Sequence, residues 1–202
     1  MRRHEVKDDA FTGLEAAIVL IAFVVVAAVF SYVVLGAGFF TTQKSQEVVH
    51  SGVTQAASNI VIKGEVYGIA NSGSTGIEYI QFDVGLAAGG VPVDINRTTM
   101  TFSTVNIAPY TLVHQYSDDN LNSTEDANLT ISDGQWLIWA ISPGASADRT
   151  LQSAETFTIR AKPRDLLTPR EKFLIEVKPE IGAALGIDRS VPASITPTTL
   201  LY

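Results

Sequence analysis

The chain has 202 residues, no cysteine and a formal net charge of −7, with an isoelectric point near 4.9. The absence of cysteine excludes disulfides, cysteine-ligated zinc and thiol nucleophiles. The acidic balance argues against a nucleic-acid-binding surface, because such a surface needs clustered lysine and arginine. Apart from one long apolar stretch near the front, the chain has the length of one globular domain.

Residues 1–9, MRRHEVKDD, form a short charged leader with three basic side chains. An ordinary secretory signal has a basic start, an apolar core of about 7 to 15 residues and a small-residue cleavage site. Here the apolar run extends over residues 16–40 without a charge, and no A-x-A site follows it. The leader is therefore not that of an ordinary secretory signal.

The apolar run predicts a membrane-competent helix. Among residues 16–40 the only polar side chains are those of Ser31 and Tyr32. A helix of this length measures about 37 Å, which is enough to cross a hydrocarbon core about 30 Å thick. A helix that is apolar on all sides lies in lipid or is surrounded by copies of itself.

The helix is predicted to continue past the apolar run, over residues 14–58, with an amphipathic second half. Small and branched apolar residues recur there at helical spacing. They are Val48, Val49, Val53, Ala56 and Ala57. Gly36 and Gly38 lie at the junction of the two halves and would permit a bend. An ordinary membrane anchor has no need of such an extension.

Glu15 is the one formal charge beside the apolar run. A carboxylate at the edge of a lipid-facing helix is costly and usually has a partner. A cut between Ala10 and Phe11 would create a free amino terminus, and this cation on an axially displaced neighbouring helix would be such a partner. The alternative is that Glu15 only marks the membrane boundary.

A leader that is cut before the apolar helix resembles the class III signals of type IV pilin-like proteins. More narrowly, residues 13–45 resemble the amino-terminal helix of archaellins, the archaeal flagellins. The matching residues are Gly13, Leu14, Ile18, Val19, Ile21, Ala22, Phe23, Gln43 and Lys44. The resemblance implies that a prepilin-type signal peptidase removes residues 1–10 by cutting between Ala10 and Phe11. The family usually has glycine before the cut, so the alternative site lies between Gly13 and Leu14.

From about residue 60 the apolar residues alternate with period two, which predicts strands. The candidate strands are 77–86, 99–105, 110–116, 135–141, 155–162 and 171–178. Turn-forming segments rich in Gly, Pro, Ser and Asp separate them. Roughly six to eight short strands predict an antiparallel, immunoglobulin-like β-sandwich. The predicted fold class is therefore α+β, with a long hydrophobic N-terminal helix before the sandwich.

The C-terminal segment 167–195 also resembles archaellins. The matching residues are Lys172, Phe173, Ile175, Val177, Pro179, Gly182, Ala183, Leu185, Ile187, Arg189, Pro192 and Ala193. Considered without the family, Pro179, Gly182 and Gly186 indicate turns or an edge strand. The middle of the chain, roughly 85 to 155, carries no recognised motif, as expected of an outward-facing variable part.

Three Asn-X-Ser/Thr triplets begin at Asn96, Asn122 and Asn128, and none has proline in the middle. All three lie in polar, loop-like sequence, as acceptors of N-linked glycans do. The resemblance implies an N-glycosylated outer domain and hence the N-glycosylation machinery as a partner. The alternative is that the three are unmodified surface loops.

The sequence predicts no catalytic, metal or cofactor site. The spacing of Asp118, Asn120, Asn122 and Thr124 hints at a calcium loop, but the sixth loop position lacks glycine and the twelfth lacks glutamate. The three histidines are far apart in the sequence. None of the common nucleotide, hydrolase or metalloprotease motifs is present. Trp136 and Trp139 have opposite parity on a strand. One is expected in the core, and the other at the surface, either at a subunit contact or as an ordinary exposed aromatic.

The resemblance implies a non-enzymatic structural subunit of the archaellum, the rotating swimming filament of archaea. The predicted organisation is a cleaved leader at 1–10, an anchoring and filament-core helix at 11–58, and an outer domain at 59–202. The predicted assembly residues are Leu14, Glu15, Ile18, Ile21, Phe23, Val26 and Phe30. The chain would lie first in the cytoplasmic membrane and then in an extracellular filament. Its implied partners are copies of itself, a motor ATPase and a membrane platform.

Three other functions are each compatible with part of the sequence. An adhesive archaeal pilin would share the leader and the helix, but the C-terminal match argues against it. A single-pass receptor or substrate-binding protein would keep residues 1–10 and remain monomeric. A helix-anchored enzyme would need catalytic motifs that the sequence lacks.

Overall fold

The structure, a computed structural model, describes residues 5–57, 59–121, 129–144 and 148–202. The chain forms two units, residues 1–51 and residues 52–202. The described residues of the first unit, from residue 5 onward, are all helical, and the second unit contains the end of the helix and all of the described strands.

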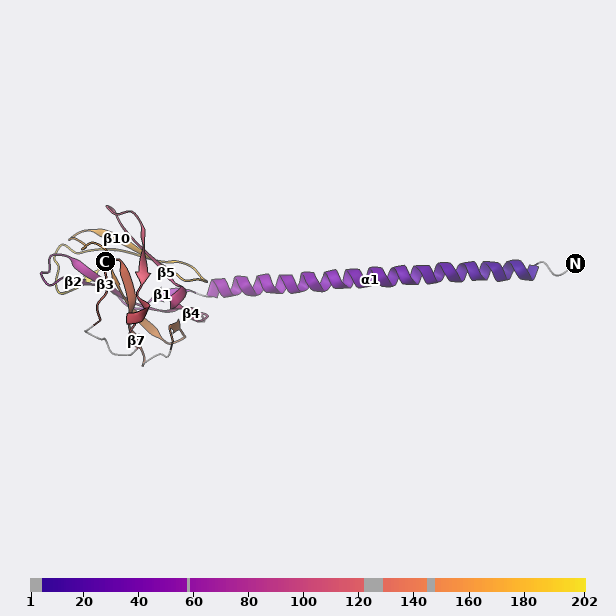
Figure 1. Ribbon diagram of the computed structural model, residues 1–202, viewed down its shortest axis with the longest axis horizontal. Helices are drawn as coiled ribbons and strands as arrows, with labels where there is room; N and C mark the ends of the chain where they lie inside the picture. Colours follow the sequence, from indigo (N-terminus) through magenta and orange to yellow (C-terminus); the bar gives the residue numbers. More distant parts are fainter. Residues whose placement is uncertain (1–4, 58, 122–128, 145–147) are drawn as a thin grey trace. The chain divides into compact units, whose positions relative to one another are not determined.

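Helix α1 (Glu5–Ala57) is a single uninterrupted helix (Figure 1). It begins earlier than the predicted helix, because residues 5–10 of the leader continue the same helix. It also runs unbroken through Gly36 and Gly38, so these glycines introduce no bend. One turn later, the hydroxyls of Thr41 and Thr42 donate to the carbonyls of residues 37 and 38 at 2.8 and 2.9 Å. Isolated glycines weaken a helix without ending it when strong helix formers surround them.

The second unit is almost entirely β-structure. Its strands are β1 (Ile60–Ile62), β2 (Val66–Ala70), β3 (Ile77–Leu86), β4 (Val93–Asp94), β5 (Thr99–Thr104), β6 (Tyr110–His114), β7 (Gln135–Ser142), β8 (Thr150–Leu151), β9 (Thr156–Lys162), β10 (Lys172–Lys178), β11 (Leu185–Ser190) and β12 (Thr198–Leu201). Two short 3₁₀ helices, η1 (Ile95–Arg97) and η2 (Tyr116–Asp118), lie between them. All six predicted strands are present. The additional strands are mostly too short to show a period-two pattern, and the prediction therefore missed them.

The main sheet has the strand order β11-β10-β5-β6-β7-β9-β3-β2-β12, with β1 paired to β3 and a separate β4–β8 pair. All described strand pairs are antiparallel except β6–β7. Strands from both ends of this order contribute to one hydrophobic core, so the sheet folds over on itself. The ends also meet, because Ser190 and Tyr202 exchange backbone hydrogen bonds of 2.7 and 3.3 Å. The predicted antiparallel β-sandwich is confirmed.

Strand β10 illustrates how the sequence determines the faces of this sandwich. Phe173, Ile175 and Val177 are almost fully buried, whereas the residues between them are exposed. This strict alternation is what a strand with one face on the core requires. The face of β10 that points away from the core remains uncovered by the rest of the described domain.

The expectation of a surface tryptophan in β7 is wrong. Trp136 and Trp139 are only 1% and 4% exposed. Strand β7 is buried on both faces, and a register irregularity between Ile138 and Ala140 occurs at Trp139. The guanidinium of Arg160 lies 3.4 Å from the centre of a Trp139 ring and covers it. This contact is a cation–π interaction across neighbouring strands.

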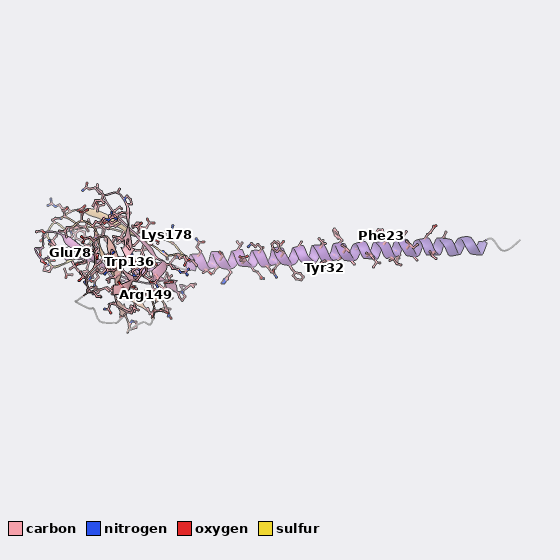
Figure 2. The ribbon with its side chains drawn as sticks, viewed as in Figure 1. Phe23, Tyr32, Glu78, Trp136, Arg149 and Lys178 are labelled. Atoms are coloured by element: carbon pink, nitrogen blue, oxygen red, sulfur yellow. The ribbon has the colours of Figure 1, made fainter. Side chains whose placement is uncertain are left out.

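Asp119 is the centre of a buried polar network that the sequence did not reveal. Its side chain is fully buried. Its Oδ1 lies 2.9 Å from Nε2 of His114 and accepts the backbone N–H of Ile138 at 2.9 Å. Its Oδ2 accepts a hydrogen bond from Nε of Arg149 at 2.5 Å. The imidazole of His114 stacks on Trp136 at 3.9 Å (Figure 2 labels Trp136 and Arg149). This one carboxylate therefore holds together β6, β7 and the segment before β8.

Candidate functional site

The apolar surface of α1 is the most unusual surface of the chain. From Leu14 to Phe40, every large hydrophobic side chain is between 52% and 79% exposed. Phe23 and Tyr32 project freely from the helix in Figure 2. The segment Thr12–Gln55 is long and apolar enough to cross a membrane. Soluble monomers rarely expose so large an apolar area, so this surface requires lipid or protein to cover it.

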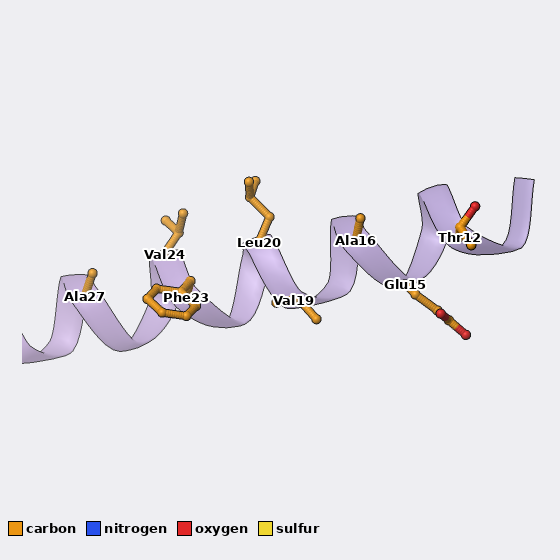
Figure 3. A pocket seen from close by; sticks show the side chains of 8 residues that line it. All are labelled: Thr12, Glu15, Ala16, Val19, Leu20, Phe23, Val24 and Ala27. Atoms are coloured by element: carbon orange, nitrogen blue, oxygen red, sulfur yellow. The ribbon is translucent and has the colours of Figure 1, made fainter. Parts of the chain in front are cut away.

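An open groove lies along the amino-terminal part of this apolar surface, between Thr12 and Ala27 (Figure 3). Two rows of side chains, each at mainly i, i+4 spacing, form its sides. One row contains Thr12, Ala16, Leu20, Val24 and Ala27, and the other contains Glu15, Val19 and Phe23. Rows at this spacing are the ridges that interdigitate when two helices pack. The small alanine side chains would let a neighbouring helix approach closely.

The seven predicted assembly residues are spread around α1 and do not form one narrow stripe. At about 100° per residue, they cover more than half of the helix circumference. They are Leu14, Glu15, Ile18, Ile21, Phe23, Val26 and Phe30, all of them exposed. Only Glu15 and Phe23 of this set line the groove. A helix that packed through all seven residues would contact several neighbours and not a single partner.

Charges on α1 are confined to its two ends. No residue between Glu15 and Lys44 is charged, a separation of about 43 Å along the axis. Nζ of Lys44 lies 2.6 Å from Oε2 of Glu47, and both side chains are exposed. The carboxylate of Glu15 therefore has no nearby cation among the described side chains of α1. Any cation that pairs with it comes from the leader, a new amino terminus or another molecule.

The candidate cleavage positions lie inside the helical backbone. Ala10 and Phe11 both belong to α1, as do Gly13 and Leu14 at the alternative position. The side chains of Ala10 and Phe11 are outside the described part of the structure. The uncut leader from residue 5 onward therefore continues the helix, and cleavage would leave a helix with a free amino terminus.

The predicted glycan acceptors differ in what the structure describes. Asn96 lies in η1, where its backbone N–H donates to Oδ1 of Asp94 at 2.9 Å. Oδ1 of Asn96 is buried without a hydrogen-bond partner, and Thr98 of the same triplet is only 7% exposed. Asn122 and Asn128 lie outside the described residues. Among the described residues, no three His, Cys, Asp or Glu side chains are grouped as metal ligands would be.

Comparisons with known proteins give consistent results. Residues 10–189 match the family model for archaeal-type flagellin. The chain is 40% identical over 200 residues to probable flagellin 1 of Archaeoglobus fulgidus, covering 96% of this chain and 95% of that one. It is 38% identical over 218 residues to probable flagellin 2 of the same organism, covering 100% and 97%.

One solved structure is similar over nearly the whole chain. It is the archaeal flagellum of Methanospirillum hungatei strain JF1, with a TM-score of 0.68 and 34% identity. The match covers 94% of this chain and 99% of that one, so it includes both α1 and the β-domain. The similarity thus extends to the combination of a long apolar helix with a β-sandwich.

Proposed function

The chain belongs to the archaeal-type flagellin family, and we propose that it polymerises through α1 after a short leader has been removed. It is a structural subunit of the archaeal flagellum, an extracellular motility filament built from copies of a flagellin. The observation that carries the proposal is the uniformly exposed apolar surface of α1. In a filament, copies of α1 would cover one another.

The proposed assembly pathway begins in the cytoplasmic membrane, with α1 as the anchor. When the helix leaves lipid and packs against other copies, apolar surface passes from one apolar environment to another. The hydrophobic effect then contributes little, and close packing at small residues such as Ala16 and Ala27 must supply the specificity. Extraction from lipid requires work, which we assign to a motor ATPase acting with a membrane platform.

We assign residues 1–10 to the leader, 11–58 to the filament core and 59–202 to the outer domain. The end of α1 at Ala57 and the start of β1 at Ile60 support the second boundary. The wide distribution of apolar residues around α1 supports a core with many helix neighbours. A structural role of this kind needs no catalytic group, and the outer domain would form the surface of the filament.

The mature amino terminus provides the direct test of this proposal. Filaments sheared from cells and analysed by intact-mass and peptide mass spectrometry are expected to begin at Phe11. The membrane fraction of cells lacking the peptidase is the control, and its chain is expected to retain residues 1–10. Filaments that begin at Leu14 would move the cut to the alternative site. Filaments that still contain Met1 would contradict leader removal and favour a permanently anchored protein.

N-glycosylation of the outer domain is the second proposed modification. We predict glycan mass on the peptide that contains Asn122 and Asn128, and little or none on Asn96. In folded protein the Asn96 triplet is a poor acceptor, because Oδ1 of Asn96 and the residue Thr98 are buried. Glycopeptide mass spectrometry of native filaments measures both. Three bare asparagines would refute the proposal, and full occupancy of Asn96 would refute the predicted order.

A further inference from the structure

Tyr32 is the one tyrosine in the apolar run of α1. It is 79% exposed and projects freely from the helix (Figure 2). Its hydroxyl has no hydrogen-bond partner among the residues that the structure describes. A tyrosine hydroxyl that becomes buried usually finds a partner, because an unsatisfied hydroxyl in an apolar environment is costly. Once other copies surround α1, the partner of this hydroxyl has to come from one of them.

Gly36 leaves an opening in the surface of the same helix. Gly36 and Gly38 are the only glycines between Leu14 and Gln43. No side chain beyond the immediate neighbours lies within 4 Å of the position that a Cβ at Gly36 would occupy. A helical side chain covers the turn on the amino-terminal side of its own Cα, so its absence at Gly36 uncovers the carbonyl oxygens of that turn. Each of these oxygens has a second lone pair, and the opening therefore offers space for a ring and an acceptor for a hydroxyl.

The proposed pairing of Glu15 with a neighbouring amino terminus sets the axial displacement of two parallel helices. If the amine of Phe11 in one copy is level with Glu15 of the next, the copies are displaced by four residues, or about 6 Å. The same displacement places Tyr32 of the first copy level with Gly36 of the second. The charge pair alone determines the displacement, and the large side chain and the opening then coincide.

Both contacts lie on one seam between the two helices. They are 21 residues apart along each helix, which is three heptads. Residues seven apart occupy equivalent positions where parallel helices cross at a shallow, left-handed angle. The seam of one copy contains the Phe11 amine, Ile18, Val25 and Tyr32, and the facing seam of the other contains Glu15, Ala22, Val29 and Gly36. The facing pairs are amine and carboxylate, isoleucine and alanine, two valines, and tyrosine and glycine. Large side chains thus face small ones, as interdigitating surfaces require.

We propose that this seam is a contact between copies in the filament core, with the ring of Tyr32 in the opening at Gly36 of its neighbour. The inference rests on the proposed polymerisation and on the proposed cut before Phe11, and it specifies which faces of α1 meet. The hydroxyl of Tyr32 donates to a backbone carbonyl in the turn that precedes Gly36. The two sides of the contact are different surfaces. Each pairing therefore leaves one surface of each kind free, so the contact propagates and does not close into a dimer.

Tyr32→Phe tests the hydrogen bond, because it removes only the hydroxyl. Sheared filaments are held at a temperature that partly dissociates them, and the free subunit left after sedimentation is measured. The loss of one hydrogen bond is expected to raise the free subunit concentration about fivefold. A hydroxyl buried without a partner would give the opposite result, since its removal would stabilise the filament. The measurement begins with formed filaments, so an effect on membrane insertion does not enter it.

Gly36→Ala tests the opening. Within one chain the added methyl group meets no obstacle, and alanine is a better helix former than glycine. A single helix should therefore tolerate the change or gain from it. The filament is expected to lose stability, because the ring of Tyr32 from the neighbouring copy occupies that space. Shortening that side chain by Tyr32→Leu makes room for the methyl group, so the double variant should lose less than the sum of the two single variants.

Gly38→Ala provides the matched control. It adds the same methyl group on the opposite side of α1, because two residues advance a helix by about 200°. Whatever its own effect, it should combine additively with Tyr32→Leu.

Two outcomes would overturn the contact: filaments stabilised by Tyr32→Phe, or additive effects of Gly36→Ala and Tyr32→Leu. Wild-type chains that form no filaments would instead refute the proposed polymerisation. If the variants do not assemble, electron cryo-microscopy of wild-type filaments decides the question. The Tyr32 hydroxyl is expected within hydrogen-bond distance of a carbonyl in the turn before Gly36 of a neighbouring copy. Any other position of this side chain would overturn the contact.

Discussion

Replacing Asp119 with alanine is expected to lower the free energy of unfolding of the outer domain by about 3 to 5 kcal/mol. The Asp119 side chain is fully buried and makes polar contacts with His114, Ile138 and Arg149. Its removal leaves the Ile138 N–H without an acceptor and the guanidinium of Arg149 without its carboxylate. Both groups then lose the partners that compensated for their desolvation. Few single substitutions elsewhere in this domain should have a comparable effect.

The measurement is urea unfolding of the full chain in detergent micelles, followed by tryptophan fluorescence. Trp136 stacks on His114 and is therefore a reporter within the same network. Asp188→Ala is the matched control, because Asp188 is an exposed carboxylate on β11. This control should change the unfolding free energy by less than about 0.5 kcal/mol. Asp119→Asn, which keeps the shape and loses the charge, should fall between the two. Equal stabilities of Asp119→Ala and Asp188→Ala would contradict the structural role of the network.

The sequence was sufficient to predict elements that satisfy one strong local rule. The apolar run identifies α1, since an element of a soluble domain does not need so many uncharged residues in succession. Strands β9 and β10 follow from strict alternation, with Phe157 and Phe173 on the buried face. In both strands, successive side chains point to opposite faces, so apolar residues at every second position indicate that one face is buried and the other exposed. The β-sandwich then follows from the number and spacing of such strands.

Features that depend on long-range pairing were not predictable in the same way. The sequence predicts that one of Trp136 and Trp139 lies at the surface, yet both are buried, and Arg160 of the neighbouring strand covers Trp139. The contact between Asp119 and Arg149 requires segments 30 residues apart to meet above β7. Period-two patterns contain no information about which strands become neighbours.

The same distinction applies to the assembly surface. The membrane-length helix and the carboxylate of Glu15 at its edge can be predicted from the sequence, because one charge beside about 25 uncharged residues is conspicuous. The sequence does not predict which residue contacts which neighbouring helix, since apolar side chains cover all sides of α1. Glu15 is the exception, because a carboxylate that a filament core would bury needs a partner of defined chemistry. It is therefore the residue of α1 whose substitution discriminates best between models of assembly.

Replacing Glu15 with alanine is expected to abolish or strongly impair filament growth while leaving membrane insertion intact. Insertion should improve slightly, because a charge is removed from the edge of an apolar helix. Assembly should fail, because the amino terminus of a neighbouring copy would be buried without a carboxylate. A loss of about 3 kcal/mol per subunit contact corresponds to a more than 100-fold increase in the subunit concentration needed for growth.

Glu47→Ala provides the matched control for this experiment. Glu47 is also a carboxylate on α1, but it is paired with Lys44 of its own helix and is exposed. An exposed pair of this kind contributes less than about 1 kcal/mol, so filament number per cell should remain close to wild type. Filaments are counted by electron microscopy, and insertion is measured as the chain retained in carbonate-washed membranes. Glu15→Gln should behave as Glu15→Ala does, because the proposed pairing needs a charge. Normal filaments from Glu15→Ala would exclude the carboxylate–amine pairing and leave Glu15 as a marker of the membrane boundary.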